Sequence, residues 1–200
     1  MRLTIQCQKK RIVEMEKKRM LAYKGFRKDL SCLGYQFVEN QWNRTDKANC
    51  RANGFHCAEN PLDCLIYYPA WETSVYYQVK ANGDLDEDAV DSKISCTELF
   101  LERKLEFVQL LFAGLKFMVV NPKRRWSKIV REEEGDADQG YAVVRGKNPR
   151  VCGKKEGDIL VIAREKSDSV DIERGAVYII DGVNFHPGIW YDVNGKVVMK

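Results

Sequence analysis

The sequence contains no apolar run that approaches the ~20 residues a helix needs to cross a bilayer, and its N-terminus lacks the apolar core of a signal peptide. It also lacks a P-loop, a Gly-x-Gly-x-x-Gly segment and any Cys-x-x-Cys pair. These absences argue against nucleotide-driven chemistry of those kinds and against a zinc site, so we expect no metal. The seven cysteines are an odd number without an export signal, which favours reduced thiols and a cytoplasmic protein.

The net charge of +4 is not spread over the chain. Residues 1–20 carry seven basic and two acidic side chains, a balance of +5, so the other 180 residues sum to −1. A nearly neutral body lacks the bias of a nucleic-acid-binding domain, and we expect nucleic-acid contact only indirectly or through a basic segment. The basic N-terminal arm, residues 1–20, is either a solvated helix or an extension upstream of a usual start at Met20.

Strand and helix patterns predict an α+β fold. Leu21–Phe26 is the first strand-like stretch, and Asn60-Pro61 provides an N-cap followed by proline at the first position of a short helix. Glu106–Val119 has the apolar stripe of a longer helix. We therefore expect a mainly antiparallel sheet with one short and one long helix over residues 21–121, followed by a β-rich C-terminal portion over residues 141–200.

Residues 122–140 are predicted to be a charged linker. Five basic side chains precede five acidic ones there, a pattern typical of a solvated loop or helix face. The basic half is also the candidate segment for contact with a partner. It comprises Lys123, Arg124, Arg125, Lys128 and Arg131.

Two short motifs are similar to those of a known enzyme family. Tyr23-Lys24-Gly25 lies near the start, and Gly54-Phe55-His56-Cys57 follows, with Tyr67 thirteen residues after Gly54. This arrangement resembles ADP-ribosyltransferases of the diphtheria-toxin and poly(ADP-ribose) polymerase type. In those enzymes an early strand carries His-Gly. A later Gly-(Ile/Leu)-Tyr-Phe-Ala segment supplies the first tyrosine, and a second tyrosine follows thirteen residues after its glycine.

The resemblance implies an NAD site. Gly25 would present its backbone to the nicotinamide amide, and Lys24 would occupy the place of the family histidine. His56 would stand where the first tyrosine belongs, and Tyr67 would form the second aromatic wall. Glu98 is the candidate catalytic carboxylate, since positive charge develops on the ribose as nicotinamide leaves. A structural, hydrogen-bonded His56 is the alternative interpretation.

A second resemblance spans both ends of the chain. Its motifs are Tyr-Lys-Gly-Phe at 23–26, Gly-Phe-His-Cys with Asn-Pro-Leu-Asp at 54–63, and Trp190-Tyr191. They look like an uncharacterised family encoded mainly by phages, prophages and gut bacteria. That setting implies a protein in the bacterial host cell that binds and inhibits a host or defence-system protein, in an anti-CRISPR-like role, without catalysis or cofactor. The NAD-dependent ADP-ribosyltransferase is the alternative.

Overall fold

The computed structural model describes residues 20–50, 52–87 and 91–199, which form two compact units. The described residues of the first unit belong to 20–59 and 73–104, and those of the second to 60–72 and 105–199. The division therefore differs from the single domain expected over 21–121. The segment 60–72 leaves the first unit because its side chains pack against the helix that begins at Phe107. The arm expected over residues 1–20 lies outside the described residues, apart from Met20.

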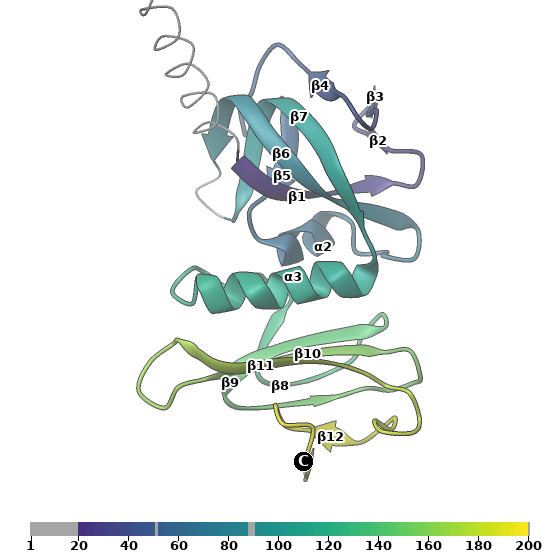
Figure 1. Ribbon diagram of the computed structural model, residues 1–200, viewed down its shortest axis with the longest axis vertical. Coiled ribbons are helices and arrows are strands. Elements are labelled where there is room, and N and C mark those ends of the chain that lie inside the picture. Colours follow the sequence, from purple (N-terminus) through teal and green to yellow (C-terminus); the bar gives the residue numbers. More distant parts are fainter. Residues whose placement is uncertain (1–19, 51, 88–90, 200) are drawn as a thin grey trace, which may run out of the picture. The chain divides into compact units, whose positions relative to one another are not determined.

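The first unit is built from strands. They are β1 (Met20–Arg27), β2 (Ser31–Cys32), β3 (Tyr35–Gln36), β4 (Trp42–Arg44), β5 (Phe55–Ala58), β6 (Ser74–Glu87) and β7 (Lys93–Leu105, whose last residue is assigned to the second unit). β1 lies between β5 and β6 and is antiparallel to both. Because β7 pairs with β5 and also with β6, the series of pairings closes on itself (Figure 1). β2 and β3 form a separate hairpin.

Side-chain alternation explains the buried core of the first unit. Tyr77, Val79 and Ala81 of β6 are buried at every second position, as expected for a strand with one face toward a core. Ala22 and Phe26 of β1 belong to the same buried cluster. Lys24 lies between them at the same period of two, so its side chain starts from the apolar face of β1.

The second unit contains every helix of the described chain. These are η1 (Pro61–Asp63), α2 (Cys64–Tyr67) and α3 (Phe107–Val120), and the strands are β8 (Val130–Asp136), β9 (Tyr141–Cys152), β10 (Ile159–Glu165), β11 (Ile172–Ile179), β12 (Trp190–Tyr191) and β13 (Val197–Val198). The sheet has the order β11-β10-β9-β12-β13, and β8 also pairs with β9. Both β8–β9 and β9–β10 are parallel, an exception to the mainly antiparallel expectation.

β8 corrects the linker expected over residues 122–140. Its charged side chains suit a strand because they are satisfied across the sheet and along the strand. Glu134 forms an ion pair with Arg150 of β9, and Arg131 forms one with Asp136. A strand with one solvated, ion-paired face has the composition of a polar linker, which is why the sequence pattern hid it.

The helices of the second unit pack through small residues. The Asn60 side chain accepts a hydrogen bond from the Leu62 amide, which confirms the predicted N-cap. Leu62 lies against Gly114 of α3, where an added Cβ would come within 2.3 Å of its side chain. A Cβ added to Gly175 of β11 would likewise come within 2.7 Å of the Leu115 side chain of α3. Figure 1 shows α3 lying along one face of the sheet, where it contacts β10 and β11.

The described chain is thus α+β with a predominance of strand, and its sheets are largely antiparallel, as expected. Among the described residues, no helix is long and apolar enough to span a membrane.

Candidate functional site

A buried lysine joins the two N-terminal motifs in the first unit. Lys24 is only 4% exposed, and its Nζ donates a hydrogen bond to the backbone carbonyl of His56 at 2.7 Å. The same Nζ lies 3.6 Å from the sulfur of Cys32 and over the rings of Phe26 and Phe37, at 5.1 and 5.4 Å from their centroids. A buried cation is costly unless it is satisfied, and here a carbonyl dipole and two ring faces provide that satisfaction.

Aromatic rings surround this lysine and anchor the β2–β3 hairpin. Phe37 contacts Phe26, Tyr35 and Phe55, with centroids 4.7 to 5.0 Å apart. Tyr35 of β3 also meets Phe55 edge-on at 4.7 Å. A two-stranded hairpin is marginal by itself. Tyr35 and Cys32 therefore hold this hairpin by packing against the core of the first unit.

A tyrosine marks the far side of the aromatic cluster. The Tyr77 ring meets Phe26 edge-on, and its hydroxyl donates a hydrogen bond of 2.6 Å to Glu39. Burial, reinforced by the bond to this carboxylate, raises the pKa of Tyr77 above its ordinary value. The phenol therefore stays protonated and keeps its role as a donor at neutral pH.

The hairpin turn has an unusual residue at its tip. Leu33 and Gly34 connect β2 and β3, and their φ angles are +49° and +80°. Positive φ at both central positions is the requirement of a type I′ turn, which favours Asn-Gly or Gly-Gly. Leucine in this conformation costs about 1–2 kcal/mol.

Leu33 receives no packing in return. Its side chain is 92% exposed, whereas Leu30, also at positive φ, packs against the buried cluster. An apolar side chain that is both strained and solvated gains nothing for folding, and such residues concentrate at functional sites. Leu33 could not be predicted from the sequence, because Leu-Gly is not a recognised turn pair.

The residues expected from the transferase resemblance are divided between the two units. Lys24, Gly25, His56 and Glu98 belong to the first, and Tyr67 belongs to the second. Gly25 is buried in β1 and pairs in register with Tyr76, while Glu98 accepts hydrogen bonds from Arg44 and Asn82. Lys24 meets the backbone of His56. Whether NAD binds here stays a prediction.

Arg145 holds the basic partner-contact segment in place through contacts with the backbone just before it and with Trp126. The Arg145 guanidinium lies 4.7 Å from the Trp126 ring and donates a bond of 2.8 Å to the Pro122 carbonyl. The predicted basic side chains at 123, 124, 125 and 128 are exposed. Arg131 differs, because it lies in β8 and its Nη1 binds Asp136. Whether any of these basic side chains contacts a partner stays a prediction.

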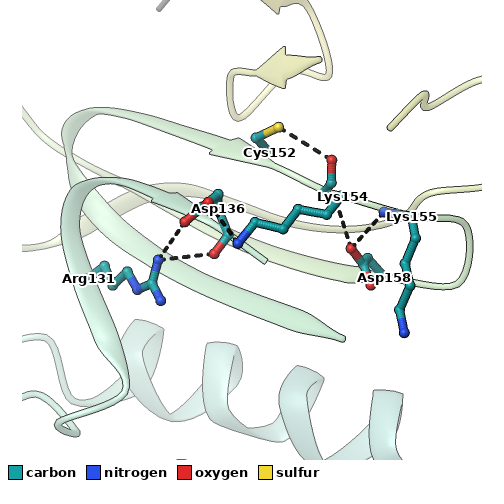
Figure 2. A network of polar contacts seen from close by, with 7 residues as sticks. Arg131, Asp136, Cys152, Lys154, Lys155 and Asp158 are labelled. Carbon is teal, nitrogen blue, oxygen red and sulfur yellow. Dashed lines mark hydrogen bonds and ion pairs between the residues drawn. The ribbon is translucent and has the colours of Figure 1, made fainter. Parts of the chain in front are cut away.

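Figure 2 shows the network to which Arg131 belongs. Asp136 pairs with Arg131 and with Lys154, each at 2.9 Å. The Oδ2 atom of Asp158 accepts the backbone amides of Lys154 and Lys155. These bonds fix the turn between β9 and β10, so the network explains local structure rather than a binding site. Across the described ranges, no cluster of His, Cys, Asp or Glu could hold a metal ion.

This network predicts an acid-sensitive contribution to stability. The hydrogen bond from Lys154, and then that from Arg131, lowers the pKa of Asp136 below its ordinary 3.8. A lowered pKa in the folded state means that the contribution is present above pH 3.8 and is lost as pH falls below it. The free energy of unfolding of wild type should therefore fall more between pH 6 and pH 2 than that of Asp136→Asn. Equal acid sensitivity of the two proteins would contradict this role.

Comparison with family models gives one match. Residues 20–113 match the model of a domain of unknown function (DUF7666). The matched range begins with β1, includes the hairpin and the Lys24 contacts, and ends within α3. No curated protein and no solved structure matches the chain.

Proposed function

We propose that this protein binds and inhibits a protein of a bacterial host or of a defence system, without catalysis, and that the β2–β3 hairpin makes the contact. The observation that supports the proposal is Leu33, a strained and almost fully exposed leucine at the tip of an anchored hairpin. The partner would offer an apolar recess for this side chain. The resemblance to phage-encoded proteins supports the choice of partner.

The mounting of the hairpin suits a binding element. The core of the first unit holds Cys32 and Tyr35 below the tip, and Gln36 donates a hydrogen bond to the Asp29 carbonyl at the base. A rigid element loses little conformational freedom on binding, so more of the contact energy remains as affinity. Arg27 and Lys28 are exposed next to this base and would provide a polar rim.

Leu33→Asp is the variant that tests the proposal. A charge at an apolar anchor should cost about 2 kcal/mol or more in binding, roughly a 30-fold loss of affinity. The tagged protein is first used to isolate a binding protein from bacterial cells, and the affinity of the two purified proteins is then measured by calorimetry. The leucine side chain is solvated and aspartate tolerates a positive φ, so the variant should fold and be at least as stable as wild type.

Val183→Asp is the matched control. Val183 is also an exposed apolar residue, but it lies at a turn of the second unit. We expect it to bind like wild type. Unchanged affinity of Leu33→Asp, or an equal loss in both variants, would rule out the hairpin as the contact.

A further inference from the structure

We propose that Lys24 and Cys32 form a covalent sulfur–nitrogen cross-link when the protein meets hydrogen peroxide. The two reacting atoms, Nζ and Sγ, already lie 3.6 Å apart. They come from β1 and from β2 of the hairpin, so the cross-link would join these two elements. The inference concerns the chemistry of this pair and does not depend on the proposed binding function.

The surroundings of the pair favour reaction between these two atoms. Lys24 Nζ is confined by the His56 carbonyl and by the rings of Phe26 and Phe37, so it cannot swing into solvent without leaving its contacts. Cys32 is only partly buried, so it is more open to a small oxidant than the four buried thiols of the described chain. Among the described residues, no carboxylate forms an ion pair with Lys24 and draws its nitrogen away from the thiol.

The reaction balances in four steps. The Cys32 thiol first loses its proton to solvent. The thiolate then attacks hydrogen peroxide, the O–O bond breaks, and the products are a sulfenic acid and hydroxide; sulfur is oxidised and peroxide is reduced. Hydroxide takes a proton from the Lys24 ammonium and becomes water. The neutral amine then attacks the sulfenic sulfur, the S–N bond forms, and the S–O bond breaks with release of a second water.

The product fits the site. Condensation of a sulfenic acid with a nearby nitrogen is known chemistry for cysteine. The linked nitrogen keeps one N–H, which can still donate to the His56 carbonyl that Lys24 contacts in the reduced protein. Excess thiol reverses the link, because two thiols form a disulfide while the amine and the cysteine are restored.

Peptide mapping tests the proposal directly. The folded protein is treated with hydrogen peroxide, unfolded and digested with trypsin. A cross-link blocks cleavage after Lys24 and joins peptide 20–27 to peptide 29–44, which contains Cys32 and no other cysteine. We expect this pair to have the summed peptide mass less two hydrogens, and to disappear when the oxidised protein is treated with dithiothreitol.

Three variants make the test specific. Cys32→Ser and Lys24→Arg should each abolish the joined pair. If arginine does not fit the buried Lys24 site and that variant does not fold, Cys32→Ser alone tests the proposal. Cys50→Ser removes another partly exposed thiol and should leave the yield unchanged. Formation of the pair only after denaturation would overturn the proposal. Oxidation of Cys32 without linkage would overturn it as well, and a linked pair that retains one oxygen would overturn the condensation step.

Discussion

Glu165→Ala is expected to lower the free energy of unfolding of the second unit by about 3–5 kcal/mol. Glu165 accepts a 2.8 Å bond from Arg145, whose side chain is only 1% exposed. Arg145 also donates to the carbonyls of Pro122 and Val170, and it lies against Trp126. Removal of the carboxylate leaves a buried guanidinium without its counter-charge, which is the costly half of a broken buried pair.

The next ion pair along β10 provides the control. Arg164 pairs with Glu173 at 3.0 Å, and both side chains are partly solvated. Glu173→Ala should therefore cost about 1 kcal/mol or less. Hydrogen exchange read by mass spectrometry separates the two units, and only peptides of the second unit should lose protection in Glu165→Ala. Equal losses of unfolding free energy in the two variants would show that the buried Arg145–Glu165 pair stabilises the second unit no more than a solvated pair does.

Phe37→Ala is expected to destabilise the first unit by about 3–5 kcal/mol. The ring is buried and lies among Phe26, Tyr35 and Phe55, so its loss leaves a cavity within the aromatic cluster. It also removes one of the two ring faces over Lys24 Nζ. Protection from exchange in the peptide that covers the β2–β3 hairpin should fall together with that of β1.

Phe112→Ala is the control of the same residue type. Phe112 lies on the exposed side of α3, and its truncation should change stability by no more than about 0.5 kcal/mol. If Phe37→Ala unfolds no more easily than Phe112→Ala, the aromatic cluster does not support the hairpin as described.

Local patterns in the sequence predicted the elements with strong local signals. Asn60-Pro61 indicated a helix start, and the Asn60 side chain caps it as expected. The strand-like stretch Leu21–Phe26 predicted the first strand, and β1 covers Met20–Arg27. The periodicity of β1 also contained the position of Lys24, since Ala22, Lys24 and Phe26 share one face. This periodicity indicates that Lys24 is buried, but the resemblance to the transferases gave Lys24 the place of the family histidine.

Other features depended on long-range pairing that no local pattern reports. β8 has a polar sequence because its charges are paired with Arg150 and along the strand itself, so it was predicted as a linker. The segment 60–72 joins the second unit through Leu62 and through Trp71, which stacks on Phe107. The strained and exposed conformation of Leu33 could be recognised only from its backbone angles and its exposure in the structure.

Site-specific photo-cross-linking in bacterial cells tests whether the hairpin tip contacts a protein partner. A photoreactive benzophenone amino acid is placed at position 33 in one protein and at position 183 in another, and both are irradiated and purified under denaturing conditions. We expect one dominant protein to be captured from position 33 and not from position 183. Capture of the same protein from both positions, or from position 183 alone, would contradict it.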